Sequence, residues 1–369
     1  MDSVILTDNK SDMIRMGKEI FASRNFSTTV IEEIKFTINT NMPDSPEEEK
    51  LDIFYQCIYD YWAFGISVQE EFSFGLKDKS VEERLEYIPY RWRLRYIWQI
   101  NNKKHAHLLH NKYETYQLLK PYYLRDVIEL TSFEDYTRFI KFIDAHPEFV
   151  VKTNGLSGSV GVYKVDSSAY VDKKNLFNKI LLGGRESTDK YKCPEVKSVV
   201  IEAMIEQSPK LSAIHPFSVN GIRVTTMRVE DRIEIIYPWF MVGANHSFVT
   251  SAVTGTYYAG IDVETGIVNT NGFKDNGNSD TVHSDTGIAF KGYEIPCWRD
   301  CIDLAKELAL KFTSINYIGW DLVLTPKGWC VMEGNFSGTF KWQMFLQKGY
   351  ASELKRLTNW ERDADFWWQ

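Results

Sequence analysis

The chain has 369 residues, of which 44% are hydrophobic and 25% are charged. This length and composition exclude a disordered or fibrous protein and predict two or three structural units with a sizeable core. The formal net charge is −7. General affinity for nucleic acid is therefore not expected, and an anionic ligand would need a locally basic site.

The chain contains five cysteines and no CxxC pair. Its first residues do not combine a basic segment with an apolar run, so no secretory signal is predicted. No apolar run approaches the roughly 20 residues that cross a bilayer. We expect reduced thiols, a cytoplasmic location and no membrane span.

Residues 1–108 are predicted to form a mainly helical region, because apolar residues recur there every three to four positions. Two helix starts support this prediction. Ser45 is followed by Pro46 and three glutamates, with Ser45 as the expected N-cap. Ser80 precedes Glu83 by three positions, which is the spacing of a capping box.

Residues 90–98 interleave basic and aromatic side chains. Such a stretch can bind nucleic acid or an anionic glycan. More often it is an amphipathic helix whose arginine stems cover a core, and we favour this interpretation. We therefore expect no nucleic-acid partner.

From about residue 110 the chain alternates between helices and strands. Strands are predicted where short β-branched and aromatic runs occur, at 149–152, 160–165, 199–205, 221–228 and 233–242. Helices are predicted where apolar residues recur at helical spacing, at 112–119, from Ser132 onward, at 172–182 and at 296–312. Gly183 and Gly184 are expected to end the third of these helices.

Residues 318–335 are predicted to form a β-hairpin around a Pro-Lys-Gly turn. A three-residue loop of this kind pairs Thr325 with Trp329. Counting back along both strands places Asp321 directly opposite Glu333. Their Cβ atoms would then be ~5 Å apart, where like charges destabilise a sheet.

Asn335 follows Glu333 by two positions and is expected on the same face of the hairpin. The side chains expected on the opposite face, toward a core, are Leu322, Leu324, Cys330 and Met332. Two carboxylates and an amide oxygen on one face suit Mg²⁺, which takes one or two carboxylates and completes its shell with water and phosphates. The alternative is a solvent-facing hairpin that carries two unrelated acids.

Residues 152–161 join two predicted strands and are rich in glycine and serine. Glycine lets backbone N–H groups approach phosphates closely. The loop is not a Walker A loop, because no Gly-Lys-Ser/Thr closes it, nor a Rossmann turn, because a strand follows. We interpret it as a flap over a triphosphate, and the alternative is an ordinary flexible loop. Its candidate phosphate-binding residues are Gly155, Ser157, Gly158, Ser159 and Gly161.

Two lysines are further candidates for phosphate contact. Lys152 ends the strand that leads into the flap, and Lys112 begins a predicted helix. Lysine binds phosphate as a point charge, although a single lysine is more often solvated.

In this order along the chain, these features resemble the ATP-grasp superfamily and, within it, the sugar-transfer-associated ATP-grasp proteins. The resemblance runs from about Lys112 to Gly338. It implies an α+β fold of the ATP-grasp kind, in which two α+β subdomains sandwich ATP. The expected subdomains are residues 109–205, with the flap, and residues 206–369, with the metal site. The helical region 1–108 lies outside the resemblance.

The resemblance also implies a role for each candidate at the nucleotide. Lys112 and Lys152 would contact the phosphates beneath the flap. Glu202 lies on the strand that enters the adenine hinge, and Met204 and Ile205 would supply hinge backbone groups.

The remaining implied roles concern catalysis and the metal. Arg223 would stabilise the transferring phosphoryl group and, with Lys152, form the catalytic set. Asp321, Glu333 and Asn335 match the Mg²⁺ ligands of the family. ATP and Mg²⁺ are therefore the expected cofactors.

Three stretches depart from the family pattern. Gly221 stands where Thr is expected, and Ser284 stands after His283 where Pro is expected. Residues 254–260 replace an expected Asn and a pair of glycines. These departures lie toward the expected binding side of the acceptor substrate, so the sequence does not identify that substrate.

The resemblance implies a carboxylate–amine ligase that acts through an acyl-phosphate. Its substrates would be a small-molecule carboxylate and an amine, with a sugar acid of a surface polysaccharide as one candidate. Three alternatives stay open: an ATP-dependent phosphotransferase, a non-catalytic nucleotide-binding module of a glycan-assembly complex, and a nucleic-acid binder. The sequence predicts no oligomeric state.

Overall fold

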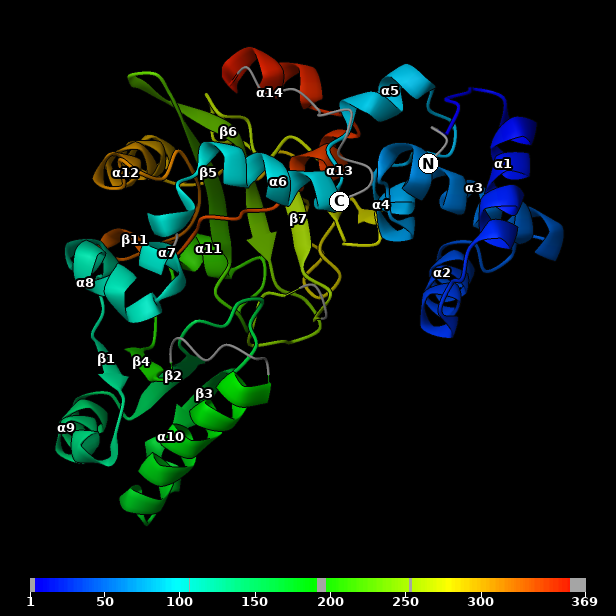
Figure 1. Ribbon diagram of the computed structural model, residues 1–369. Helices are drawn as coiled ribbons and strands as arrows, with labels where there is room; N and C mark the ends of the chain where they lie inside the picture. Colours follow the sequence, from blue (N-terminus) through cyan, green and yellow to red (C-terminus); the bar gives the residue numbers. More distant parts are fainter. Residues whose placement is uncertain (1–3, 106, 191–196, 252–253, 359–369) are drawn as a thin grey trace. The chain divides into compact units, whose positions relative to one another are not determined.

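The computed structural model describes residues 4–105, 107–190, 197–251 and 254–358. Figure 1 shows the helices and strands of the chain. By their internal contacts they divide into two compact units. The first unit comprises residues 1–99, 273–279 and 339–369, and the second comprises residues 100–272 and 280–338. The three-part division expected from the sequence stays a prediction.

The first unit is helical, as predicted for the N-terminal region. Its helices are α1 (Lys10–Ser23), α2 (Thr28–Asn41), α3 (Glu47–Phe64), α4 (Val68–Ser73), α5 (Val81–Glu86), α6 (Tyr90–Ile100, whose last residue belongs to the second unit), α13 (Trp342–Leu346) and α14 (Ala351–Thr358). The capping box of Ser80 and Glu83 is confirmed at the start of α5. Ser45 is not the N-cap of α3, because the helix begins one residue later and Pro46 takes the N-cap position without a side-chain bond.

Helix α6 contains the basic and aromatic stretch. Trp92, Arg93, Tyr96 and Ile97 are buried on one side of it, and the Trp92 indole donates to the carbonyl oxygen of Phe64 at 2.9 Å. The stretch is therefore an amphipathic helix with one face in a core, as we favoured.

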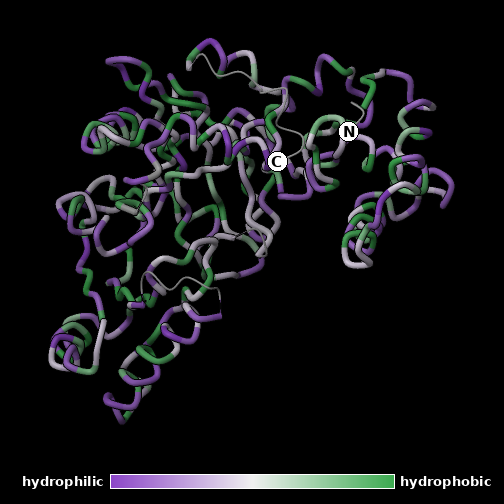
Figure 2. The backbone as a smooth tube through the Cα atoms, in the orientation of Figure 1, coloured by the Kyte–Doolittle hydropathy of each residue, from purple (hydrophilic) through white to green (hydrophobic). Residues whose placement is uncertain are grey.

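The second unit contains a small antiparallel sheet with the strand order β1-β4-β2-β3. Its strands are β1 (Val127–Leu130), β2 (Glu148–Thr153), β3 (Val162–Asp166) and β4 (Val199–Ala203). Helices α9 (Tyr136–Ala145) and α10 (Lys173–Lys190) pack against it through a shared apolar core. Figure 2 shows hydrophobic and hydrophilic residues alternating around α10, as an amphipathic helix requires.

Two features of this sheet differ from the sequence expectation. Strand β1 was not predicted. Helix α10 does not end at Gly183 and Gly184 but continues to Lys190. A Cβ atom on Gly184 would lie 2.1 Å from Cγ2 of Val199, so this glycine permits close packing of the helix on β4 and is no C-cap.

A large antiparallel sheet forms the rest of the unit, with the strand order β11-β10-β5-β6-β7-β8-β9. Its strands are β5 (Gly221–Val229), β6 (Arg232–Val242), β7 (Tyr257–Gly260), β8 (Gly272–Phe273), β9 (Ser279–Asp280), β10 (Tyr317–Thr325) and β11 (Gly328–Asn335). One face packs on an apolar core with α8 (Lys112–Tyr123) and α12 (Trp298–Lys311). The short helices α7 (His107–His110) and α11 (Pro209–Ser212) complete the unit. A mixed α+β class with a helical N-terminal region is confirmed.

The predicted β10–β11 hairpin is present, but its register was only partly correct. Asp321 lies opposite Glu333, as predicted, whereas Thr325 pairs with Gly328 and not with Trp329. The pairing near the turn is thus shifted by one residue from the prediction. A register shift after Asp321 compensates for it, because a β-bulge places one extra residue on one strand.

The bulge also reverses the faces of β11 before Glu333. Leu322 and Leu324 lie in the apolar core, as predicted, but Trp329 and Val331 join them there. Cys330 and Met332 were wrongly assigned to this core, because the two-residue turn moves every residue of β11 up to the bulge by one position.

Candidate active site

A buried ion triad joins the small sheet to the segment before it. Lys152 Nζ lies 2.8 Å from Oε1 of Glu202 on β4. Arg125, which lies between α8 and β1, donates to Oε2 of the same carboxylate from Nε at 2.8 Å and lies within 2.6 Å through Nη2. Burial by itself would raise the pKa of Glu202, but the two cations outweigh it and hold that pKa at about 2.

Arg125 also reaches the large sheet. Its Nη1 donates to the carbonyl oxygen of Val331 at 2.7 Å, and Val331 lies two residues before Glu333. The sequence analysis missed Arg125. A lone arginine after a helix gave no signal while β1 was unrecognised, and the strand that follows it is the only local clue.

Lys112 connects the glycine-rich loop to the hairpin. Its backbone N–H donates to Oδ1 of Asn154 at 2.7 Å, and its Nζ donates to the carbonyl oxygen of Leu156. The same Nζ lies 3.5 Å from Oε1 of Glu333. The structure therefore brings a predicted phosphate-binding lysine next to a predicted metal ligand.

Asn154 was also missed, although it lies inside the glycine-rich segment. It is fully buried, and its Nδ2 donates to side-chain oxygens of Asn111 at 2.8 Å and Ser198 at 3.0 Å. These bonds fix the start of the loop to both α8 and the approach to β4.

The glycine-rich loop, residues 155–161, connects β2 to β3 as expected. Gly155, Gly158 and Gly161 have φ angles of 77°, 66° and 70°, and Ser159 has a φ of 63°. A Cβ atom on Gly161 would lie 2.5 Å from Oγ1 of Thr153, so glycine is required there both for its backbone angle and for space. Ser157 is exposed.

The hairpin acids are both paired with cations. Asp321 is buried and accepts two bonds from Arg223, through Nε and, at 3.0 Å, through Nη2. Burial by itself would lower the pKa of Arg223, but Asp321 raises it. Burial raises the pKa of Asp321, although Arg223 opposes this shift. Asn335 Nδ2 donates to Oδ2 of Asp321 at 3.2 Å.

The donor set fits Mg²⁺ of the kind that arrives with a nucleotide. Asp321 and Glu333 are cross-strand partners, and Asn335 lies opposite Gly319 on the same pair of strands. Two carboxylates and one amide oxygen leave places for substrate phosphates. Within the described residues, no group of three or more His, Cys, Asp or Glu side chains is placed to hold a metal.

Met204 and Ile205 follow β4 directly and are partly exposed. They lie at the end of the strand that carries Glu202, where backbone groups are free of the sheet ladder.

A sequence profile described as sugar-transfer-associated ATP-grasp matches residues 91–359. The chain belongs to this family. The resemblance drawn from the motifs is thereby confirmed, and so is the ATP-grasp fold that it implied. No curated protein sequence matches this ATP-grasp chain.

Solved structures similar to this ATP-grasp protein include D-alanyl-alanine synthetase A of Vibrio cholerae, at 14% identity and a TM-score of 0.40 over 72% of this chain and 65% of that one. D-alanine–D-alanine ligase of Coxiella burnetii shares 13% sequence identity at a TM-score of 0.34, and the match covers 64% of this chain and 50% of that one. Phosphoribosylamine–glycine ligase of Thermotoga maritima shares 16% sequence identity at a TM-score of 0.39, and the match covers 64% of this chain and 49% of that one. The matches span half to two thirds of these chains.

No helix in the described part of this ATP-grasp chain is both long and apolar enough to cross a membrane.

Proposed function

We propose that the chain is an ATP- and Mg²⁺-dependent carboxylate–amine ligase that acts through an acyl-phosphate. The observation that carries the proposal is the pairing of charges at the hairpin. Arg223 holds Asp321, and Lys112 faces Glu333. Each carboxylate expected to bind a cation thus rests against a cation expected to bind phosphate.

This arrangement is suited to exchange partners when a magnesium nucleotide binds. The carboxylates would turn from the basic side chains to Mg²⁺, and the basic side chains would turn to the phosphates. No charge is then left unpaired in the low-dielectric site, where an isolated charge is costly. Glu333 has the freedom for this change, because 34% of its side chain is exposed.

The nucleotide would lie along the line from β4 to the hairpin. Because Arg125 and Lys152 already occupy both oxygens of Glu202, recognition of adenine would rest on backbone groups of Met204 and Ile205. Lys152 and Lys112 would bind phosphates beneath the flap of residues 155–161, where glycines with positive φ angles would let the backbone approach an anion closely.

The proposed reaction requires the protein to position the reactants and to stabilise the charge that develops during phosphoryl transfer. ATP phosphorylates the carboxylate substrate, the amine attacks the acyl-phosphate, and ADP and phosphate leave. Arg223 would stabilise the phosphoryl group in transfer, with Lys152 beside it. Bound Mg²⁺, held by Asp321, Glu333 and Asn335, would supply charge neutralisation at the phosphates.

We infer a sugar acid as the carboxylate, because the family is described as associated with sugar transfer. An amino acid or another amine would then be joined to a sugar acid during synthesis of a surface polysaccharide, in the cytoplasm. A phosphotransferase that uses the same site and stops at a phosphorylated hydroxyl is the competing function.

The test is a screen of uronic acids and other carboxylates with ATP, Mg²⁺ and hydroxylamine. A ligase releases ADP only with its carboxylate and forms a hydroxamate, because hydroxylamine traps the acyl-phosphate. Phosphorus NMR of the same mixtures identifies the products. A stable phospho-product without hydroxamate would replace the ligase by the phosphotransferase, and no substrate-dependent ADP release at all would favour the non-catalytic module.

A further inference from the structure

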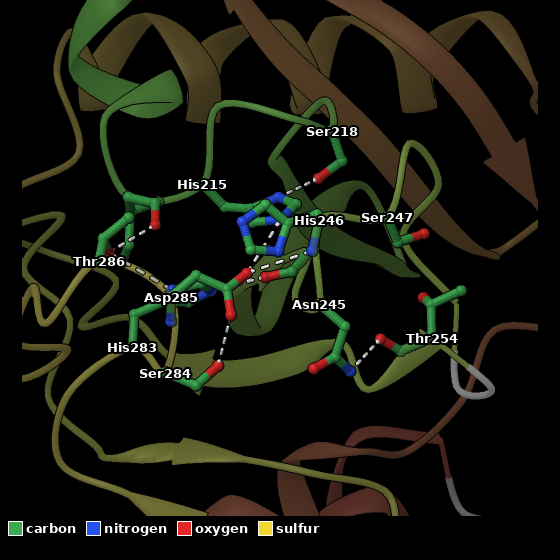
Figure 3. A network of polar contacts seen from close by, with 12 residues as sticks. His215, Ser218, Asn245, His246, Ser247, Thr254, His283, Ser284, Asp285 and Thr286 are labelled. Atoms are coloured by element: carbon green, nitrogen blue, oxygen red, sulfur yellow. Dashed lines mark hydrogen bonds and ion pairs between the residues drawn. The ribbon is translucent and has the colours of Figure 1, made fainter.

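Two buried polar networks of the second unit lie outside the residues assigned above. Figure 3 shows the first, in which His215 and Asp285 point toward one another. Ser218 Oγ lies 2.9 Å from Nδ1 of His215, and Oδ2 of Asp285 lies 3.5 Å from its Nε2. With the Ser218 hydroxyl donating to Nδ1, the ring carries its proton on Nε2, facing the carboxylate. The donors and acceptors of this network match, so it is complete without a ligand.

The second network centres on Asn101, in the segment that follows α6. Asn101 is only 4% exposed. Its Oδ1 accepts from the backbone N–H of Tyr317 at 2.7 Å. Its Nδ2 donates to the carbonyl oxygens of Tyr317, at 2.9 Å, and of Phe336, at 2.8 Å. Both N–H groups and the oxygen are thus used, which fixes the orientation of the amide.

The two bonds to Tyr317 continue the large sheet where β11 has ended. The last pair of β10 and β11 is Gly319 with Asn335. Tyr317 lies two residues before Gly319, so its backbone groups point to the same side of β10. The amide of Asn101 therefore takes the place that a further residue of β11 would have.

The bond to Phe336 reaches the backbone beside a candidate metal ligand. Phe336 directly follows Asn335, the last residue of β11. Asn335 Nδ2 donates to Oδ2 of Asp321 at 3.2 Å, so the amide oxygen of Asn335 is the atom that a cation would use. Without Asn101, Asn335 would form the terminal pair of the ladder, where a strand opens most readily.

Two further bonds fix the place of Asn101 itself. The side chain of Asn316 donates from Nδ2 to the carbonyl oxygen of Ile100 at 2.7 Å. The backbone N–H of Asn102 donates to the carbonyl oxygen of Ser314 at 3.3 Å. Residues 100–102 are thus attached along the segment that leads into β10.

We propose that Asn101 is a positioning residue of the metal site, which holds Asn335 where its amide oxygen can bind Mg²⁺. This assignment rests on the proposed function, in which Asp321, Glu333 and Asn335 hold the ion. Mg²⁺ demands near-ideal octahedral geometry, so a ligand on a loose strand end binds it less well. Groups that orient a metal ligand without touching the ion typically contribute about 10- to 100-fold to metal affinity.

The binding test is calorimetry of the full-length protein with a non-hydrolysable ATP analogue, once with Mg²⁺ and once with EDTA. The dissociation constant in EDTA divided by that with Mg²⁺ measures how much the metal strengthens binding. Asn101→Ala should lower this ratio about tenfold and change the dissociation constant in EDTA less than twofold. An unchanged ratio, with or without weaker binding in EDTA, would overturn the proposal.

Asn316→Ala is the matched control, because it removes a side-chain bond between the same two segments but none to Phe336. It should lower the melting temperature and leave the ratio within about twofold of the wild type. If it lowers the ratio as much as Asn101→Ala does, a general loosening of the segment explains the result and the positioning role is overturned.

Asn101→Ser is the second variant, measured in place of Asn101→Ala if that protein does not fold. Serine offers one donor where the amide offers two, so it cannot hold both carbonyl oxygens, and the same loss of the ratio is expected. A wild-type ratio in Asn101→Ser would then overturn the proposal.

The wild-type protein separates this role from the proposed function. If Mg²⁺ does not strengthen binding of the analogue to the wild type, the metal site of the proposed function fails, and the role of Asn101 falls with it. If Mg²⁺ strengthens binding equally in the wild type and in Asn101→Ala, only the role of Asn101 is overturned.

Discussion

Removing the charge of Glu202 should make the protein less stable at neutral pH and much less sensitive to acid. Arg125 and Lys152 hold the pKa of this buried carboxyl at about 2, against an ordinary value of 4.5. At roughly 1.4 kcal/mol per pH unit, this difference corresponds to about 3 kcal/mol of stability. Because the folded-state pKa is depressed, this stability is present above about pH 4.5 and is lost as the pH falls toward 2.

The measurement is urea unfolding of the wild type and of Glu202→Gln from pH 7 to pH 3. At pH 7 the variant should be less stable by about 3 kcal/mol, since two buried cations lose their partner. The difference should shrink steadily below pH 4.5. Glu206→Gln, an exposed site four residues along, should change neither stability nor its pH dependence. A constant difference between Glu202→Gln and wild type across the pH range would refute this account of the triad.

Three further outcomes are expected. Asp321→Asn and Glu333→Gln should both abolish Mg²⁺-dependent turnover. Calorimetry should show a lower melting temperature only for Asp321→Asn, because this change leaves the buried Arg223 without its partner, at a cost of about 3 kcal/mol in stability. Equal melting temperatures of the two variants would contradict the pairing of Arg223 with Asp321. Gly161→Ala should weaken ATP binding more than Gly158→Ala, since both have positive φ but only Gly161 lies against Thr153; equal dissociation constants would argue against a shaped flap. In the first unit, burial raises the pKa of Glu71 and of its neighbour Asp60, which share one arginine, Arg84. Because the pKa of Glu71 is raised in the folded protein, its ionisation lowers the stability of the wild type as the pH increases. Between pH 5 and pH 8, Glu71→Gln should therefore have a higher melting temperature than the wild type. A lower melting temperature over that range would contradict this account.

Local patterns predicted much of this protein. The capping box at Ser80, the amphipathic helix around residues 90–98, the strands β2 to β6 and the β10–β11 hairpin depend on contacts within a few residues, whereas β7 to β9 were not predicted. The order of motifs between Lys112 and Gly338 was enough to indicate the family, because a motif order does not depend on how the segments pack.

Packing decided where local patterns were ambiguous. The two glycines in α10 look like a helix end, but Gly184 is there to let β4 approach. Asp321 lies opposite Glu333 because a shorter turn and a bulge cancel, and neither could be read from the hairpin alone. The sequence analysis therefore predicted the Asp321–Glu333 pair correctly but from a wrong turn length.

Only the tertiary structure revealed the partners of the buried charges. Arg125 and Glu202 are 77 positions apart, and His215 and Asp285 are separated by the whole of β5 to β9. A charge buried in a medium of low dielectric must find a partner in space, whatever its distance along the chain. Composition and periodicity identify which side chains can carry charge, whereas the folding of the two sheets determines which of them meet.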